Sequence, residues 1–389
     1  MAIQQGFFLI ADITGYTQYL SETELDHAQS ILTNLLNLLI EHTRPPLVIS
    51  RLAGDAVISY GLSNHFLQGQ TFAESLEDTY VSFRRMVELM VRNTTCQCRA
   101  CQNIGALDLK FFVHHGAFAV QKLDAHDELV GSDVNLLHRL LKNHVTETLG
   151  LRAYTLYTEP ALRKLGLDPA GAGMTGLVEQ YEHLPPVRVF VTDMHPVWER
   201  KRRQTQAAIA PSDILVRVDC DINLRPELVW DYLIQPDHYA VLTGAIRMAV
   251  EGRHGGRVGS GSSLQCYHGD GTMLPLTVVD WQPFERVVSR FDVPVPIKGA
   301  VGITELRLEA TADGTRLAQI MAKTRGPLVG RMLGDIAFRR MRSKFEADMR
   351  RFKEHIEADW AALAANQPPR ASISGERIRA AARESLSPA

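Results

Sequence analysis

The chain has 389 residues, of which 45% are hydrophobic and 22% are charged, and its formal net charge is −2. This length suits two domains of ordinary size, and the composition is that of a globular protein. The near-neutral charge gives no electrostatic reason to expect binding to nucleic acid or to an anionic membrane, and no apolar run approaches the length of a membrane span. The N-terminus lacks the basic start of a signal peptide and the five cysteines are an odd number, so we expect a cytoplasmic protein.

The first predicted element is a buried strand that leads to an aspartate. Residues 7–10 are all apolar and run into Asp12, and Gly15 follows in a turn. A buried carboxylate is costly unless it is paired, and a glycine lets backbone N–H groups approach a ligand closely. A carboxylate beside free amides suits a metal ion that carries phosphates. The alternative is that Asp12 only caps the next helix.

A helix and a β-hairpin with a second aspartate come next. The helix has apolar residues at helical spacing over 25–39 and ends before a proline pair. Residues 47–60 form two apolar runs separated by Gly54 and Asp55, which is typical of a hairpin with an aspartate at its tip. Asp12 and Asp55 can therefore supply the carboxylates of a two-metal site for phosphoryl transfer.

Three cysteines, Cys96, Cys98 and Cys101, lie close together in the sequence. Three thiols in so short a segment can bind zinc or an iron–sulfur centre, although four ligands are usual. His114, His115 or a symmetry-related chain would then complete the set. The alternative is a reduced loop that faces solvent, or an adventitious disulfide.

The remaining elements of the first half complete an α+β pattern. They are a helix at 73–92, a strand at 107–120, a helix at 134–145 and strands at 153–158 and 188–192. On the second of these helices Asn135 and Arg139 lie four residues apart, on one face, so Arg139 can reach a phosphate with Asn135 beside it. The order of elements is compatible with a ferredoxin-like sheet covered by helices on one side.

Taken together, residues 5–195 resemble the catalytic domain of class III nucleotidyl cyclases, the adenylate and guanylate cyclases. The resemblance implies two Mg²⁺ or Mn²⁺ ions, held by Asp12, the carbonyl of Ile13 and Asp55. It also implies that a nucleoside triphosphate contacts a second set of residues, namely Gly15, Thr17, Arg51, Glu128, Asn135 and Arg139. In that set we expect Asn135 and Arg139 to be catalytic, because they would orient the ribose and stabilise charge on the α-phosphate.

The positions that would contact the base differ from those of adenylate cyclases. The lysine that selects the base in those enzymes falls on Arg51, and its aspartate partner falls near Glu128. The charges are retained, but arginine is a planar fork whereas lysine is a point charge. The choice between ATP and GTP therefore stays open, and we favour ATP.

The resemblance also predicts an assembly. In this family the active site lies between two catalytic domains, and this chain contains one. A two-fold symmetric homodimer with two equivalent sites is therefore expected. One chain would supply Asp12 and Asp55 to a site, and the other would supply Asn135 and Arg139.

The second half of the chain has a different pattern. A basic and polar stretch at 196–211 is predicted to be a linker, and a second domain is predicted at 212–360. This domain contains a strand from Ile214, a short helix at 226–233, a long C-terminal helix and further strands at 246–253, 262–269, 273–282, 285–293, 301–310 and 315–323. The tail at 361–389 has no apolar period and is predicted to be disordered.

A strand, a short helix, a meander and a long helix form a helix-grip. The pattern resembles the START-like superfamily, which includes polyketide cyclases and Bet v 1-like proteins. Such folds often leave an apolar cavity, so we expect a hydrophobic ligand, and the alternative is a filled core.

The sequence thus predicts an enzyme that converts a nucleoside triphosphate to a 3′,5′-cyclic nucleotide and pyrophosphate, with a hydrophobic ligand of the second domain as its regulator. The alternative is a catalytically inactive module that binds nucleotide or only dimerises, with a START-like domain that binds a lipid or an aromatic metabolite. A third hypothesis makes the START-like domain itself the enzyme.

Overall fold

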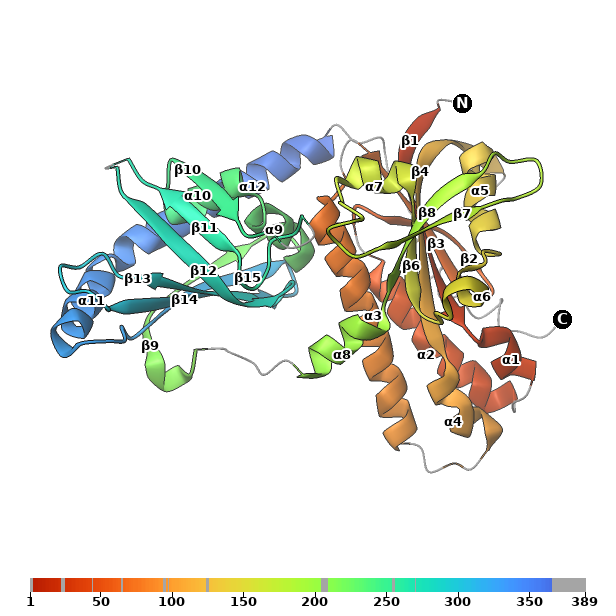
Figure 1. The fold of residues 1–389 in the computed structure, drawn as a ribbon, viewed down its shortest axis with the longest axis horizontal. Helices are drawn as coiled ribbons and strands as arrows, with labels where there is room; N and C mark the ends of the chain where they lie inside the picture. Colours follow the sequence, from red (N-terminus) through yellow and green to blue (C-terminus); the bar gives the residue numbers. More distant parts are fainter. Residues whose placement is uncertain are drawn as a thin grey trace. The chain divides into compact units, whose positions relative to one another are not determined.

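The computed structural model describes residues 3–21, 25–43, 45–63, 66–93, 96, 98–123, 126–203, 209–253, 256–269 and 271–365. The chain divides near residue 204 into two compact units, each built around its own sheet (Figure 1). The prediction of an α+β protein, with a ferredoxin-like first domain and an antiparallel helix-grip domain after it, is confirmed. Among the described helices, none combines the length and the apolar character needed to cross a membrane.

The first unit is organised around a central antiparallel strand. In the described part of the chain its sheet has the order β2-β3-β1-β4-β6-β8-β7, and β5 pairs with β4 outside this path. The strands are β1 (Gln4–Thr14), β2 (Val48–Ala53), β3 (Ala56–Leu62), β4 (Asp108–Leu123), β5 (His126–Val130), β6 (Tyr154–Thr158), β7 (Thr175–Glu179) and β8 (Val187–Asp193). β1 pairs antiparallel with both β3 and β4, so three strand ends meet beside Asp12.

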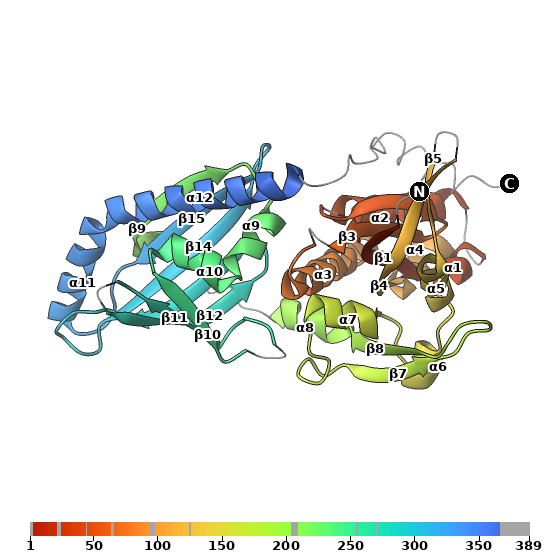
Figure 2. The same ribbon diagram turned by 90° about the horizontal axis from the view of Figure 1, so that it is seen from above.

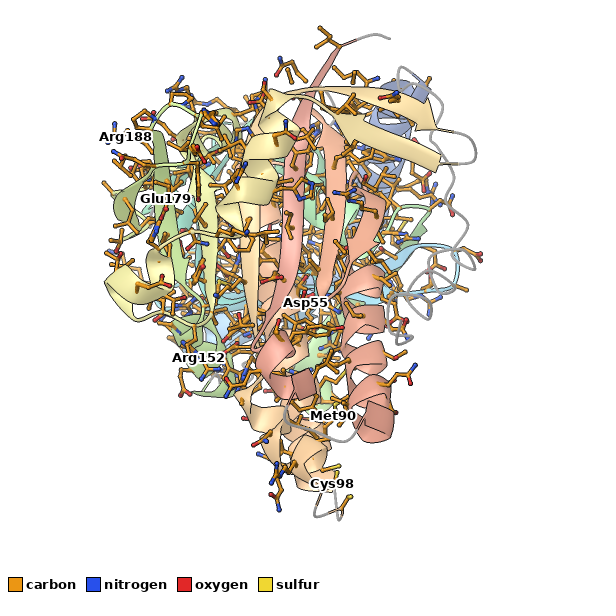
Figure 3. All side chains as sticks on the ribbon, turned by 90° about the vertical axis from the view of Figure 1, so that its right-hand side faces the viewer. Asp55, Met90, Cys98, Arg152, Glu179 and Arg188 are labelled. Atoms are coloured by element: carbon orange, nitrogen blue, oxygen red, sulfur yellow. The ribbon has the colours of Figure 1, made fainter. Side chains whose placement is uncertain are left out.

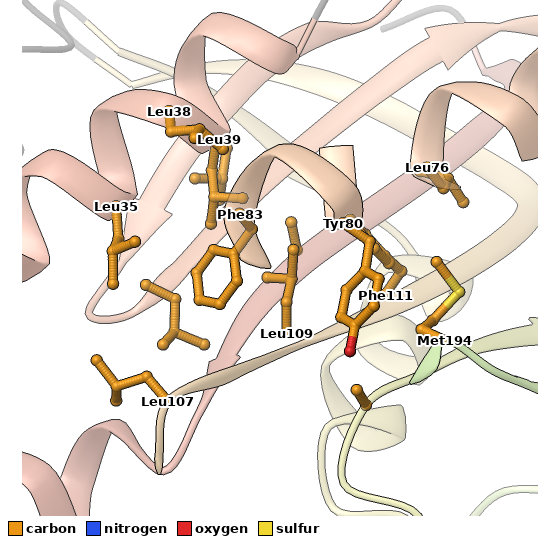
Figure 4. Packing of buried hydrophobic residues seen from close by; sticks show 14 of the residues in the cluster. Leu35, Leu38, Leu39, Leu76, Tyr80, Phe83, Leu107, Leu109, Phe111 and Met194 are labelled. Atoms are coloured by element: carbon orange, nitrogen blue, oxygen red, sulfur yellow. The ribbon is translucent and has the colours of Figure 1, made fainter. Parts of the chain in front are cut away.

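Helices cover both faces of this sheet. They are α1 (Tyr16–Ser21), α2 (Leu25–His42), α3 (Gly69–Asn93), α4 (Arg99–Asn103), α5 (Ser132–Leu140), α6 (Val145–Leu149), α7 (Glu159–Leu165) and α8 (His195–Arg203), with a 3₁₀ turn, η2 (Ile104–Ala106). Phe7 and Leu9 of β1 pack with α2 and α3 in one core, part of which is drawn in Figure 4. Phe8 and Ile10 pack with α5 in the other. The expectation of helices on one side was therefore wrong, and burial on both faces explains the continuous apolar run.

Two predicted boundaries of this unit change. The helix expected over 134–145 ends at Leu140, and α6 begins at Val145. Asn143 separates them, because its Nδ2 donates to the carbonyl of Leu140 at 2.8 Å and its Oδ1 accepts from the amide of Val145 at 2.9 Å. The stretch expected to be a linker starts as helix α8, because Trp198 is buried in the core of the first unit.

The second unit wraps an antiparallel sheet around a long helix. In the described residues the strand order is β10-β11-β12-β13-β14-β15-β9. The strands are β9 (Ile214–Ile222), β10 (Arg247–Glu251), β11 (Ser263–Tyr267), β12 (Met273–Gln282), β13 (Arg286–Asp292), β14 (Val301–Ala310) and β15 (Thr315–Ala322). The helices are η3 (Pro211–Asp213), α9 (Pro226–Leu233), α10 (Pro236–Thr243), α11 (Leu328–Arg340) and α12 (Arg342–Ala365). Helix α12 lies along the sheet beside α10 (Figure 2).

The ends of this unit differ from the prediction in two respects. The single long C-terminal helix is two helices, α11 and α12, which separate at Met341. The predicted tail was to begin at 361, but α12 continues to Ala365, and the rest of that tail lies outside the described residues.

Candidate functional site

The two predicted metal-binding aspartates lie at the same end of the first sheet. Asp12 is near the end of β1, where it pairs with Ala56 of β3. Asp55 occupies the β2–β3 turn, which Gly54 makes possible with its φ of +63°. The amide of Ile13 donates to the carbonyl of Asp55 at 3.3 Å, so the two carboxylates come from adjacent backbone segments. Asp55 is labelled in Figure 3.

The charges at this end of the sheet favour a cation. Burial, together with the neighbouring Asp55 carboxylate, raises the pKa of Asp12 to about 7, and Lys110 opposes the shift. Burial also raises the pKa of Asp55, against the effect of its own backbone N–H. Two partly buried carboxylates that repel each other hold protons until a cation replaces them. The donor set therefore fits hard divalent ions such as Mg²⁺ or Mn²⁺.

Lys110 belongs to this site, although its role was not predicted. It pairs with Asp12 across β1 and β4, and side-chain alternation puts both residues on the α5 face of the sheet. Burial lowers the pKa of Lys110, and the Asp12 carboxylate opposes that shift. Its Nζ lies 3.4 Å from the hydroxyl of Thr146 and 5.1 Å from the ring centre of Tyr154. The ammonium is thus held beside the aspartates, where it can meet a phosphate.

The turn after Asp12 is tightly supported. Gly15 has a φ of +88° and closes the first turn of α1, where its carbonyl accepts from the amide of Tyr19 at 2.9 Å. Arg152 braces this turn from the side, because its carbonyl accepts from the hydroxyl of Thr14 at 3.1 Å. Thr17, predicted to contact substrate, lies on α1 and is exposed.

Asn135 and Arg139 both lie on the exposed side of α5, as their spacing predicted. The opposite side of the helix is buried against β4, through Val134, Leu137 and Leu140. Among the described residues, no ion pair joins Arg139 to Asp12 or to Asp55.

A buried network fixes the start of α5. The Asp133 carboxylate accepts from the amide of Ala117 at 2.6 Å and lies 3.4 Å from Nε2 of His114. Nδ1 of His114 lies 2.9 Å from the hydroxyl of Thr158. A Cβ on Gly116 would stand 2.3 Å from the same carboxylate, so the site requires glycine there. His114, with the adjacent Ala117 amide, lowers the pKa of Asp133.

The structure places one of the two positions that were predicted to contact the base. Arg51 is exposed on β2, and its Nη2 lies 3.0 Å from Nε2 of His138, the residue before Arg139. Arg51 therefore belongs with the α5 half of the site. Glu128 pairs with Gln121 in the β4–β5 ladder, and its side chain lies outside the described residues.

The three clustered cysteines converge in space. The sulfurs of Cys96, Cys98 and Cys101 all lie within 4.8 Å of one another, and none forms a disulfide. The histidines proposed to complete the set do not join them. His114 faces Asp133 and Thr158, and Nε2 of His115 lies 2.7 Å from the hydroxyl of Ser63.

Comparison with protein families matches the two halves of the chain separately. A family described as a protein of unknown function (DUF2652) matches residues 32–148. A family described as polyketide cyclase / dehydrase and lipid transport matches residues 213–357. The second match confirms the predicted START-like resemblance of the C-terminal domain.

Individual proteins similar to this chain include one relative in sequence and two in structure. An uncharacterized protein of Mycobacterium tuberculosis is 41% identical over 63 residues, which are 16% of this chain and 30% of that protein. A bacterial light-regulated adenylyl cyclase has a TM-score of 0.38 and 12% identity, over 52% of this chain and 57% of its own. The guanylyl cyclase Cya2 has a TM-score of 0.35 and 12% identity, over 49% of this chain and 92% of its own. This chain thus spans less than two thirds of the first two proteins, and class III cyclases are similar to about half of it.

Proposed function

We propose that the first unit is a nucleotidyl cyclase, which converts a nucleoside triphosphate to a 3′,5′-cyclic nucleotide and pyrophosphate. The observation that carries the proposal is the carboxylate pair, Asp12 and Asp55, with Lys110 beside it. Burial raises the pKa of both carboxylates, and the effect of Lys110 does not offset this at Asp12, so the pair favours further positive charge. A metal-bound triphosphate supplies that charge and also the anion that Lys110 can bind.

The residues divide the chemistry between them. Asp12, Asp55 and the carbonyl of Ile13 would hold two Mg²⁺ or Mn²⁺ ions, which when bound lower the pKa of the ribose 3′-hydroxyl and neutralise the triphosphate. Lys110 would bind a phosphate oxygen beside the aspartates. The amides of the turn at Gly15, which a glycine leaves open, would approach the same phosphates, with Thr17 at the rim.

The second half of the site lies on α5. Arg139 would stabilise the negative charge that develops on the α-phosphate, and Asn135 would orient the ribose by hydrogen bonds. Arg51 and Glu128 would contact the base. Arg51 reaches this half through His138, which supports a place for it on the same side of the substrate as Asn135 and Arg139.

A homodimer would bring the two halves together. Asn135 and Arg139 are exposed on a helix whose other side is buried, so a second chain can meet them. A two-fold axis then completes two equivalent sites at once, because each chain offers both halves to its partner. In this proposal a triphosphate is held and activated only where the two halves meet.

We further infer that the second unit binds a hydrophobic ligand and regulates the first. The support is the match to a family described by lipid transport and polyketide chemistry. The rival function is a module that binds nucleotide without turnover. One observation favours it: the guanidinium of Arg51 already contacts His138, so it is partly engaged before a base arrives.

The experiment that separates these functions is product analysis. Purified protein is incubated with ATP, GTP, CTP or UTP in the presence of Mn²⁺, and the products are identified by mass spectrometry. The proposal predicts a 3′,5′-cyclic nucleotide and pyrophosphate, with the ATP product favoured, and neither product from Asp55→Asn. Binding of nucleotide without any cyclic product from the wild-type dimer would establish the rival.

A further inference from the structure

The cysteine segment forms a compact sulfur cluster at the edge of the first core. Cys101 is buried, whereas Cys96 and Cys98 are half-buried and pack against the same core. Cys98 is labelled in Figure 3. Cys98 also caps α4, because its sulfur accepts from the amide of Cys101 at 3.4 Å. The three sulfurs lie within 4.8 Å of one another. This separation is close to the spacing of about 3.8 Å between thiolates that share one tetrahedral zinc ion. A disulfide would use two of them and leave the third without a function.

We propose that Cys96, Cys98 and Cys101 bind one Zn²⁺ ion through three thiolates, with the fourth position open to water or to an external ligand. Thiolates prefer soft and borderline ions, and zinc accepts a tetrahedral set without redox chemistry. The three sulfurs already lie within 4.8 Å of one another, so only small movements are needed to bring them onto one ion. The sulfur cluster is separate from the carboxylates that would hold Mg²⁺ or Mn²⁺, and its ligands suit a different metal.

The same segment supports the turn that follows Asp12. The buried carbonyl of Ala100, next to Cys101, accepts from the hydroxyl of Tyr19 at 3.0 Å. The carbonyl of Ala106 accepts from Nη2 of Arg152 at 2.9 Å and lies against Gly15, where an added Cβ would stand 3.4 Å from it. Zinc that orders this segment therefore also steadies the Gly15 turn. An effect of zinc on nucleotide binding through the Gly15 turn rests on the proposed cyclase function. Zinc binding itself does not depend on that function.

The test measures zinc without reference to activity. Reduced, metal-free protein is titrated with Zn²⁺ in competition with a chromogenic chelator, and Co²⁺ is substituted to record the sulfur-to-cobalt charge-transfer band. Cys98→Ser is the informative variant, because serine keeps an acceptor for the amide of Cys101 but removes one thiolate. Cys220→Ser removes a half-buried thiol outside the cluster and is the matched control.

The proposal predicts one zinc per chain, an affinity at least 100-fold lower in Cys98→Ser, and an unchanged affinity in Cys220→Ser. It also predicts that zinc raises the Tm of the wild type but not of Cys98→Ser. Metal-free protein with three titratable thiols at micromolar zinc would overturn it, as would a Cys98–Cys101 disulfide or equal zinc affinity in both variants. Zinc that binds as predicted but leaves nucleotide affinity unchanged would overturn only the link to the Gly15 turn.

A second and independent feature is the outer face of helix α11. Helix α11 packs inward through Gly330, Gly334 and Phe338, and most of its other bulky apolar residues lie outward. Six large apolar residues of this helix and its end are 38–69% exposed, namely Leu328, Val329, Met332, Leu333, Ile336 and Met341. Nearly half of the exposed large hydrophobic residues in the described chain thus lie in this one segment, the α11 face.

The charge of the α11 face is positive. Arg331, Arg339 and Arg340 are exposed beside the apolar residues, and Lys298 is exposed in the loop that packs on Gly330. The carboxylate of Asp335 accepts from the amide of Thr324 at 2.8 Å, so it is turned toward the fold. Bulky apolar residues flanked by arginines suit the interface of an anionic membrane. A second copy of the same face would bring like charges together.

We infer that the α11 face docks on a membrane surface that contains anionic lipid. The net charge of −2 does not oppose this, because the attraction is local and acts within a Debye length. Nucleic acid would bind the arginines but would leave the apolar side chains exposed to water. A lipid surface can take up both, so we assign the face to a lipid surface.

Sedimentation with vesicles tests this inference. Vesicles of phosphatidylcholine alone are compared with vesicles that also contain phosphatidylserine, at low and high salt. The wild type should sediment with the anionic vesicles and be released by salt, whereas Met332→Ser/Leu333→Ser and Arg339→Glu/Arg340→Glu should each lose at least 10-fold in binding. Val279→Ser, a change at an exposed apolar residue outside the α11 face, is the control. No binding, equal binding to neutral vesicles, or a dimer that the apolar variant dissociates would overturn the inference.

Discussion

Replacing Asp12 by asparagine separates the function of this carboxylate from its effect on stability. The pKa of Asp12 rises from 3.8 to about 7 on folding, chiefly through burial. An acid whose pKa is raised in the folded state stabilises the fold most below its unfolded pKa, and that contribution is lost as the pH rises through the folded value. A rise of about three units corresponds to about 4 kcal/mol, which the metal-free protein loses between pH 4 and pH 7.

The neutral variant Asp12→Asn avoids this loss. At pH 8, without divalent ions, its free energy of unfolding should exceed that of the wild type by up to about 4 kcal/mol. The repulsion with Asp55 also ends, so part of the gain comes from the second carboxylate. The advantage should shrink as the pH falls toward 4. Turnover should be abolished, because the variant lacks one ligand of the proposed metal site.

Urea unfolding followed by circular dichroism measures the difference, at pH 8 and at pH 5, in the presence of a chelator. Asp313→Asn, at an exposed turn of the second unit, is the matched control and should change neither value. Added Mn²⁺ should stabilise the wild type at pH 8 but not Asp12→Asn. A variant less stable than the wild type at pH 8, or one that Mn²⁺ stabilises equally, would refute the reasoning.

Two further predictions concern one partly buried and one buried carboxylate. Asp133→Asn weakens the bond from the Ala117 amide and should lower the free energy of unfolding at pH 7 by about 1–2 kcal/mol. The pKa of Asp133 is lowered on folding, so this difference in stability should vanish as the pH falls through the pKa of the folded state. Urea unfolding at pH 7 that shows no difference between variant and wild type would contradict the prediction. In the second unit, Asp280→Asn leaves Arg286 buried without its carboxylate and should cost about 3 kcal/mol or more in thermal unfolding. The double variant Asp280→Leu/Arg286→Met should lose less stability than Asp280→Asn. An equal or greater loss would contradict this and would show that the ion pair itself stabilises the fold.

Local sequence signals were sufficient for most elements of the fold. The Gly54-Asp55 turn between two apolar runs located the hairpin, because a positive φ at the tip requires glycine. Helix α5 was found from its apolar period, and its exposed face follows from the same period. Strand β7 was missed because it is an edge strand with one buried residue of five, so its sequence carries no apolar alternation. Helix α10 was missed although Pro236 and Gly244 mark its two ends.

The site was only partly predictable because its partners come from long-range pairing. Asp12 and Asp55 were found since each follows an apolar run. Lys110 stands in a strand sequence without special features, and only the β1–β4 register places it beside Asp12. The contact of Arg51 with His138 depends on how α5 packs on the sheet, which neither local sequence encodes. Sequence patterns thus locate individual metal ligands, whereas the charged residues around those ligands can be identified only from the fold.

The central claim, a catalytic site shared between two chains, is tested most directly by complementation. Asp12→Ala and Arg139→Ala are purified separately, shown to exchange subunits, and then mixed in equal amounts with ATP and Mn²⁺. Each variant alone should be inactive. Random re-pairing makes half of the dimers heterodimers with one intact site of two, so the mixture should recover about a quarter of the wild-type rate of cyclic nucleotide formation. A mixture that exchanges subunits but stays inactive would contradict the account.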